Sequence, residues 1–430
     1  MFNDHDDRHA RRSHESLTRN LSQALLKANM SRHARDTGED PLADVLLRDA
    51  AREGVSDIHL DPQSDGVRVR FRIDGHLHDT LLLTNDHGTR LIRHFQAISG
   101  MDTAPFKPGD ARMVHNVDGH TLYLRLAAVP SVCGEKLSIR ILDRERIDRR
   151  LHQLGLADVQ LARVTDWLSN ISGLFLVAGP TGSGKTTTLY ALLHELKLRQ
   201  RSIVTIEDPV EYQIDGIVQI QADSRHGLDL EQGLRTMLRL DPDYLLLGEI
   251  RTAPAAHAAV ESAGSGRVLM STIHSADAAS AVTSLRNLGL QDHEIAASLR
   301  LVAAQRLVRI LCRHCRRRVP VTAAERQWLQ AVGLPSDGEE MWHANGCGEC
   351  RHLGYQGRVG IFEVWRLTED DCGLILAHAD ERTLRNLTTS QRVQSLLHDG
   401  YDKAAAGITS LDELRHVAAD YVIRIPSATP

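Results

Sequence analysis

Hydrophobic and polar residues alternate strictly in one stretch near the start of the chain. In the segment 67–73 every second residue is apolar, and each residue between is arginine. This pattern predicts a half-buried β-strand, and the following Asp74–Gly75 pair predicts the turn at its end. The preceding residues 41–53 have apolar positions at helical spacing and are closed by Gly54, so a helix is expected there.

Two further strands are predicted in the segment 121–143, around a loop that contains Pro130 and Gly134. Together with the first strand and helix, they make residues 41–143 a small α+β domain. The charged segment 144–153 is predicted to be a linker.

Residues 1–40 are polar and rich in His, Arg and Asp. Within them Leu17, Leu21 and Leu25 recur at every fourth position, which predicts a short amphipathic helix. A mobile tail and a helix that docks onto a partner are both open interpretations of this segment.

From residue 154 onward the pattern changes to short apolar runs separated by helical stretches. Such runs are typical of strands in a largely parallel sheet, with helices as the crossovers. Helical patterns at 384–407 and 410–423 close the chain, so residues 154–430 are predicted to form one α/β domain. The apolar runs lie at 173–179, 201–208, 243–250 and 266–274.

Composition excludes several classes of protein. The chain has 430 residues, of which 42% are hydrophobic and 25% charged, as in soluble proteins of two or three domains. Aromatic residues make up 4% and the formal charge is −5, which argues against direct nucleic-acid binding. No apolar run approaches the ~20 residues of a membrane span, and the N-terminus lacks the apolar core of a signal peptide. A cytoplasmic protein is expected, held at a membrane through partners.

A glycine-rich loop follows the first apolar run of the second domain. The sequence GPTGSGKT, residues 179–186, matches the phosphate-loop pattern and lies between a predicted strand and a predicted helix. Lys185 is expected to bind the β- and γ-phosphates of ATP, and the Thr186 hydroxyl to bind Mg²⁺. The predicted nucleotide-binding residues are Gly179, Pro180, Thr181, Gly182, Ser183, Gly184, Lys185, Thr186 and Thr187.

Acidic residues end two other apolar runs. Where many nucleotide hydrolases have an aspartate that helps hold Mg²⁺, the run 243–250 has Gly248, and Glu249 follows. Glu207, Asp208 and Glu211 follow another run, and the carboxyl ends of parallel strands line a ligand crevice. Acids that merely cap turns are the alternative interpretation for 207–211.

Four of the six cysteines form two CxxC pairs, Cys312 with Cys315 and Cys347 with Cys350. In a reducing compartment this spacing indicates metal binding, and four thiolates suit tetrahedral zinc with no open position. A nucleic-acid-binding ribbon is the competing interpretation, because four arginines crowd the first pair. Cys133 and Cys372 are expected to be ordinary buried residues.

The motifs, taken in order, resemble one family over roughly residues 41–425: the secretion ATPases of type II secretion systems and type IV pili. SDIHLDP, VRFRIDG and CGEKLSIRILD are similar to the small N-terminal domain of that family. GPTGSGKTTTLY resembles its phosphate loop, TIEDPVEYQ its acidic box, LLLGEIR its atypical strand with Gly-Glu, and STIHSADA its histidine box. The paired CxxC segments resemble its zinc subdomain.

The resemblance implies a RecA-like P-loop ATPase domain with a small N-terminal α+β domain and a zinc-binding subdomain. It implies that Glu249 acts at the metal and the attacking water, with Glu207 as a second acid, and that His274 contacts the γ-phosphate. Arg112 and Arg125 are expected to reach the nucleotide. Thr252 stands where the family commonly has an acid, and Ser265-Gly266-Arg267 replaces its usual Thr-Gly-His.

The function implied by the resemblance is that of a homo-hexameric motor that uses ATP, Mg²⁺ and structural Zn²⁺. It would move an inner-membrane platform protein, together with other secretion or pilus-assembly components, from the cytoplasmic side. Two alternatives remain open: a conjugation or DNA-uptake ATPase with the same core, and a nucleotide-dependent scaffold without turnover.

Overall fold

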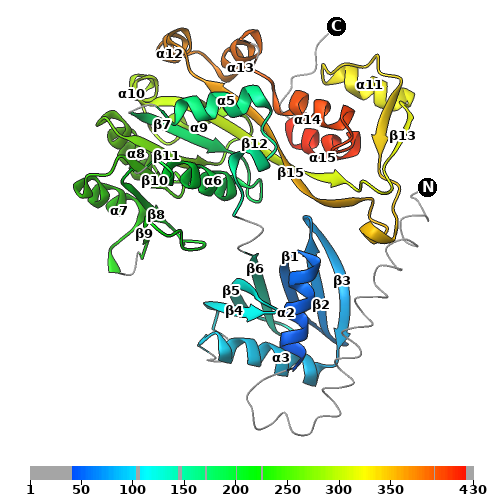
Figure 1. Cartoon of the computed structure of the whole chain (residues 1–430). Helices are drawn as coiled ribbons and strands as arrows, with labels where there is room; N and C mark the ends of the chain where they lie inside the picture. Colours follow the sequence, from blue (N-terminus) through cyan, green and yellow to red (C-terminus); the bar gives the residue numbers. More distant parts are fainter. Residues whose placement is uncertain are drawn as a thin grey trace. The chain divides into compact units, whose positions relative to one another are not determined.

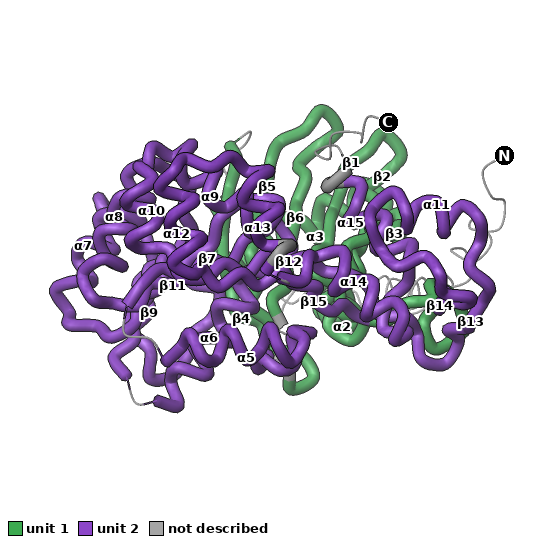
Figure 2. The backbone as a smooth tube through the Cα atoms, turned by 90° about the horizontal axis from the view of Figure 1, so that it is seen from above, with its two compact units in different colours: residues 1–147, 345–356 green, residues 148–344, 357–430 purple. Residues whose placement is uncertain are grey.

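The computed structural model (Figure 1) describes residues 41–102, 107–143, 148–169, 172–199, 201–223, 226–391 and 393–422. Contacts divide the chain into two compact units, which Figure 2 colours separately. Unit 1 comprises residues 1–147 and 345–356, and unit 2 comprises residues 148–344 and 357–430. The predicted tail 1–40, with its short helix, and residues 144–147 of the predicted linker lie outside the described residues.

Unit 1 contains a six-stranded sheet in which the strand order is β3-β2-β1-β6-β5-β4 and neighbouring strands are antiparallel. Helices α2 and α3 pack against this sheet. The apolar residues of β2 are buried and its arginines are partly exposed, as the alternation predicted. The elements are α2 (Pro41–Glu53), β1 (Val55–Gln63), β2 (Gly66–Ile73), β3 (His76–Leu83), α3 (Asn85–Ile98), β4 (Gly109–Val117), β5 (His120–Ser131) and β6 (Gly134–Asp143).

The hairpin between β5 and β6 corrects one detail of the sequence interpretation. Pro130 belongs to β5, where it pairs with Glu135, and the turn consists of Val132 and Cys133. Cys133 is therefore exposed at the tip of a hairpin, and the expectation that it is buried was wrong. Cys372 is partly buried.

Unit 2 is built on a seven-stranded sheet in the order β15-β12-β7-β11-β10-β8-β9. The strands from β12 to β9 pair in parallel, as predicted from the apolar runs. The strands are β7 (Gly173–Ala178), β8 (Ile203–Glu207), β9 (Val218–Gln221), β10 (Tyr244–Leu247), β11 (Val268–Ile273), β12 (Leu299–Leu311) and β15 (Tyr355–Arg366). The helices among them are α6 (Lys185–Lys197), α7 (Leu230–Met237), α8 (Ala253–Gly264), α9 (Ala278–Asn287) and α10 (Asp292–Ser298).

The remaining elements precede the sheet or follow β12, except η4, which lies between α7 and β10. The helical pattern predicted at 384–407 is two helices, α13 and α14, because the chain leaves the helical conformation after Ser390 and α14 begins at Leu396. Ser395 caps α14 by accepting a hydrogen bond from the His398 amide. The elements are η2 (Leu151–Gln153), α5 (Asp158–Trp167), η4 (Leu238–Leu240), β13 (Arg317–Pro320), α11 (Ala323–Ala331), β14 (Glu340–His343), η5 (Gly348–Cys350), α12 (Glu369–Leu376), α13 (Glu381–Ser390), α14 (Leu396–Ala405) and α15 (Leu411–Val422).

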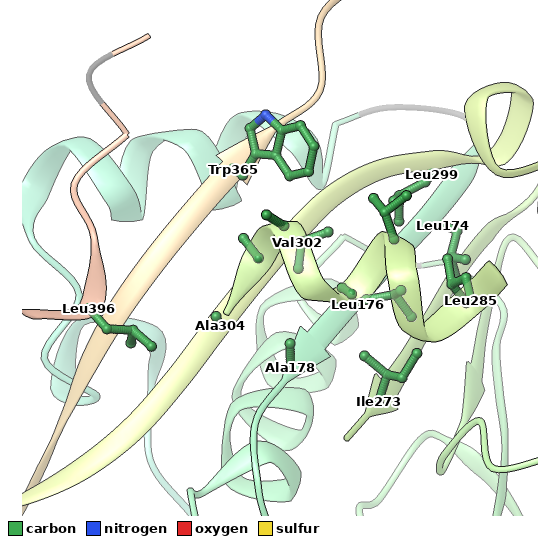
Figure 3. Close-up of a cluster of buried hydrophobic side chains, with 14 of the residues drawn as sticks. Leu174, Leu176, Ala178, Ile273, Leu285, Leu299, Val302, Ala304, Trp365 and Leu396 are labelled. Carbon is green, nitrogen blue, oxygen red and sulfur yellow. The ribbon is translucent and has the colours of Figure 1, made fainter. Parts of the chain in front are cut away.

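The core of unit 2 lies around the central strands of its sheet. Leu174, Leu176 and Ala178 of β7 are fully buried, and Figure 3 shows them beside side chains from β11, α9 and β12. Trp365 of β15 and Leu396 of α14 extend the same cluster. At ~25 cal/mol per Å² of apolar surface, burial of this kind is the main stabilising term for the sheet that carries the site.

Candidate active site

Four segments that carry the phosphate loop, a histidine or an acid leave the same edge of the sheet in unit 2. Because β7, β11, β10 and β8 are adjacent and parallel, their carboxyl ends meet there. The phosphate loop follows β7, His274 follows β11, Glu249 comes two residues after β10, and Glu207 is the last residue of β8. The strand order thus brings together segments that are far apart in the sequence.

The phosphate loop turns directly into α6, whose first residue is Lys185. Gly184 caps the helix with a left-handed backbone (φ 89°), a conformation that side chains with a Cβ rarely adopt. The Thr186 side chain is exposed, and the Ser183 side chain is buried. The start of α6 therefore presents backbone N–H groups in the manner of an anion-binding helix terminus.

The Lys185 ammonium is held inside the loop. It donates hydrogen bonds to the carbonyl oxygens of Gly179 at 2.8 Å and Pro180 at 3.0 Å. Burial lowers the pKa of Lys185 to about 8, with nearby Glu249 acting in the opposite direction. A phosphate that entered the loop would replace carbonyl dipoles with full negative charge, so it would favour the protonated amine.

A pocket of about 700 Å³ opens beside the loop. Its walls include Pro180 and Thr181 of the phosphate loop, His274, and Arg306 of β12. Hydroxyl side chains of α9, among them Ser280 and Thr283, and the acidic Glu381 of α13 also line it. The volume lies within the ~300–1,000 Å³ typical of small-molecule sites.

Glu249 and His274 lie side by side. Their Oε2 and Nε2 atoms are 3.8 Å apart, and Arg251 Nε is 2.7 Å from the same carboxylate oxygen. Burial and the neighbouring Lys185 lower the pKa of His274, although Glu249 raises it in part. His274 is thus favoured in its neutral form near pH 7, in which one ring nitrogen donates and the other accepts.

The glycine at position 248 has a packing reason. Its amide donates to the Ile206 carbonyl at 2.8 Å, and a Cβ built on it would lie 3.3 Å from the Glu207 Cα. A side chain here would require the neighbouring backbone to move by a few tenths of an ångström. The acid of this segment is the next residue, Glu249.

Glu207 does not face open solvent. Its carboxylate accepts hydrogen bonds from the Tyr190 hydroxyl at 2.5 Å, the Thr205 hydroxyl at 2.7 Å and the Gln219 amide at 3.3 Å. Burial raises its pKa, and these hydrogen bonds oppose the increase. The Tyr190 hydroxyl also accepts the Glu211 amide hydrogen at 3.1 Å, so it ties α6 to both ends of the acidic box.

Other residues of the predicted site lie in less buried places. Asp208 is exposed and Glu211 is partly buried. Arg112 of β4 and Arg125 of β5 belong to unit 1, where they are direct cross-strand neighbours, so their side chains share one face of the sheet. Thr252 caps α8 by accepting a hydrogen bond from the Ala255 amide.

One residue of the site has no counterpart in the motifs. Gln305 of β12 is fully buried, and its side-chain oxygen accepts a hydrogen bond from Thr188 of α6 at 2.7 Å. The signal in the sequence is a single amide in a strand that otherwise consists of apolar residues and three arginines, which is too weak to assign a role.

The four paired cysteines converge. The sulfur atoms of Cys312, Cys315, Cys347 and Cys350 all lie within 4.8 Å of one another, and those of Cys347 and Cys350 are 3.7 Å apart. Tetrahedral zinc with Zn–S bonds of ~2.3 Å would set its sulfurs about 3.8 Å apart. The amides of Cys347 and Gly354 point at the Cys350 sulfur, both at 3.2 Å, as expected around a thiolate. The donor set fits zinc.

The parallel sheet, the phosphate loop after β7 and the acid and histidine that follow neighbouring strands define the RecA-like class of P-loop ATPase domains. This is the predicted fold class. The ATPase DotB of Legionella pneumophila has the same fold, with a TM-score of 0.65 and 20% identity over 88% of this chain and 95% of that one. The pilus retraction motor PilT, solved with bound ADP, gives a TM-score of 0.58 and 21% identity over 86% and 95%.

Sequence comparison goes beyond the fold. The family model described as Type II/IV secretion system protein matches residues 35–416. Type II secretion system ATPase E of Vibrio cholerae is 37% identical over 386 residues, covering 88% of this chain and 75% of that protein. Type IV pilus assembly ATPase TfpB of Acinetobacter baylyi is 36% identical over 404 residues, covering 92% and 68%.

The chain belongs to the type II/IV secretion system protein family, which confirms the resemblance seen in the sequence. In the described part of the chain, every helix is too short or too polar to cross a membrane.

Proposed function

We propose that this chain hydrolyses Mg²⁺-ATP as one subunit of a homo-hexameric motor that assembles a type IV pilus or a type II secretion pseudopilus. The observation that carries the proposal is a phosphate loop with Glu249 and His274 beside it, in a chain of this family. Family membership supports ATP hydrolysis, and the relatives' names point to these two machines.

In the proposed site, Lys185 and the loop amides hold the phosphates, and Thr186 contributes a hydroxyl to Mg²⁺. The metal would neutralise phosphate charge when bound. Glu249, close to Lys185 and only partly exposed, orients and deprotonates the attacking water, and His274 donates to the γ-phosphate.

Three other predicted residues have supporting roles in this proposal. Glu207, held by Tyr190 at the end of β8, is a second acid that would act with Glu249 when the metal is bound. Arg112 and Arg125 supply positive charge to the transition state, within one subunit or across a subunit interface. Zn²⁺ is held by Cys312, Cys315, Cys347 and Cys350 as a structural ion.

The partners follow from the same proposal. The hexamer would act on an inner-membrane platform protein, with other secretion or pilus-assembly components, and would stay on the cytoplasmic face of the inner membrane through those contacts. Direct nucleic-acid binding is not part of the proposal. Arg316 and Arg318, two of the arginines near the zinc ligands, lie over the Trp342 ring, 4.7 and 5.2 Å from its centroid.

Steady-state phosphate release, with size-exclusion chromatography in parallel, tests the proposed function. The wild-type protein should release phosphate, and Lys185→Ala should not, because the β/γ-phosphate contact is lost. Wild-type turnover in the variant would refute the site. Hydrolysis stimulated by single-stranded DNA would favour a translocation ATPase, and nucleotide binding without turnover would favour a scaffold.

A further inference from the structure

Gln305 is hydrogen-bonded to the helix that follows the phosphate loop and lies close to two glycines of the loop. Its side-chain oxygen accepts the Thr188 hydroxyl hydrogen at 2.7 Å. Its backbone oxygen lies so close to Gly179 that a Cβ there would be 2.7 Å away, and its amide nitrogen would be 2.8 Å from a Cβ on Gly184. The two glycines are the first and last of the loop, so one residue of β12 supports both ends.

The position of β12 explains these contacts. The strand pairs in parallel with β7, and Ala304 is the partner of Ala178, the last residue before the loop. The next residue, Gln305, therefore stands beside the first residue of the loop. A phosphate loop binds through backbone N–H groups that point at one centre, so its affinity depends on how firmly both ends are held.

We propose that Gln305 is a positioning residue of the nucleotide site: through Thr188 and the two loop glycines, it holds the phosphate loop in its phosphate-binding conformation. The proposal rests on the proposed nucleotide site. Gln305 itself need not touch nucleotide. Its removal should weaken the binding of every ligand whose β-phosphate enters the loop, ADP as well as ATP.

The test is binding of a fluorescent ADP analogue, together with KM and kcat for ATP, on the full chain. Gln305→Leu keeps the size of the side chain and removes the amide, and Thr188→Val removes only the hydroxyl at the other end of the bond. We expect Kd for ADP and KM for ATP to rise about tenfold in each variant, which corresponds to ~1.4 kcal/mol, while kcat at saturation changes little. The double variant should be no weaker than Gln305→Leu alone, because the hydrogen bond that Thr188→Val removes is already absent in Gln305→Leu.

Gln160→Leu is the matched control. Gln160 is equally buried in unit 2. Its side-chain nitrogen donates to the Phe362 carbonyl at 2.8 Å, and its side-chain oxygen accepts from the Ala157 backbone amide at 2.9 Å, both away from the loop. The Gln160→Leu variant should have a lower melting temperature and an unchanged Kd for ADP. The proposal is overturned if Gln305→Leu behaves like this control, or if the effects of Gln305→Leu and Thr188→Val simply add. If Gln305→Leu does not fold, the Kd for ADP of Thr188→Val decides: an unchanged value overturns the proposal. Failure of the wild-type protein to bind the analogue would instead refute the proposed function.

Discussion

At the scale of single residues, Lys185 combines burial with a positive charge. In the nucleotide-free site, burial holds its pKa at about 8. Bound phosphate oxygens would raise that pKa, because an opposite charge within contact distance favours the charged form. Above pH 8, binding must therefore be accompanied by proton uptake.

This linkage predicts how nucleotide affinity depends on pH. Below pH 8 Lys185 is already charged, and the Kd of ADP should be flat. Above pH 8 the Kd should rise by up to about tenfold per pH unit, until the pKa of the bound state is reached. Fluorescence titrations between pH 7 and 9.5 measure the slope. Lys185→Arg, whose guanidinium stays charged, should show no slope whatever its absolute affinity, and a slope of equal size in that variant would assign the effect to another group.

Glu249 is the residue whose change should separate binding from chemistry. Glu249→Gln keeps the shape of the side chain and removes its ability to take a proton, so kcat should fall by about 10²–10⁴. ADP affinity should stay within about threefold of wild type, because the phosphate loop is untouched. Single-turnover hydrolysis and equilibrium binding, measured on the same preparation, provide both numbers. Loss of binding would show that Glu249 has a structural role.

At the scale of elements, α6 is tied on two sides. Thr188 bonds to β12, and Tyr190 bonds to Glu207 at the end of β8 and to the backbone of Glu211. The helix that begins the nucleotide site is thus connected to the acidic box by one phenol group. A shift of α6 cannot leave Glu207 in place without breaking a buried hydrogen bond.

Tyr190→Phe removes this phenol and leaves the ring packed against Tyr212. The Glu207 carboxylate would lose its shortest hydrogen bond, so we expect a loss of about 1–3 kcal/mol in the free energy of unfolding. Hydrogen exchange in 208–217 should accelerate, because the Glu211 amide loses its acceptor. Tyr244→Phe is the control, since the Tyr244 hydroxyl donates to the Leu168 carbonyl at 3.0 Å, away from the acidic box. Equal acceleration of 208–217 in both variants would mean that Tyr190 does not hold the acidic box.

At the scale of the whole molecule, a metal would join two stretches that the sequence keeps apart. Cys312 directly follows β12, the strand that carries Gln305, whereas Cys347 and Cys350 lie after the β13–α11–β14 segment. The free energy of binding zinc would then contribute to the folding of residues 312–350.

Elemental analysis tests this site. We expect one zinc per wild-type chain and little in Cys347→Ser, because three thiolates and a hydroxyl hold the ion far less well than four thiolates. Residues 312–350 should become more susceptible to proteolysis in the variant, while ADP still binds. Cys133→Ser, at an exposed hairpin tip, is the control and should keep its zinc. Wild-type protein that is folded and active without metal would refute the zinc site. One zinc per chain in Cys347→Ser would exclude Cys347 as a ligand.

The sequence by itself determined those features that depend on local pattern. Alternation fixed β2, apolar runs fixed β7, β8, β10 and β11, and the spacing of Gly179, Gly184 and Lys185 fixed the phosphate loop, because each rests on residues a few positions apart. The spacing of the paired cysteines likewise predicted a metal site. Local spacing also indicated that acids and a histidine follow parallel strands.

Tertiary structure decided everything that depends on which strands are neighbours. The order β12-β7-β11-β10-β8 places Glu249 beside His274, buries Glu207 against Tyr190 and sets Gln305 against the loop. The strand order also places the backbone of Glu207 next to Gly248, where there is little space for a side chain. No residue near Gly248 in the sequence predicts this neighbour. The exposed Cys133 is a local exception, because it lies in the two-residue turn of the β5–β6 hairpin. The other contacts join residues far apart in the chain, and a local pattern carries no information on which distant segment supplies the other half of such a contact.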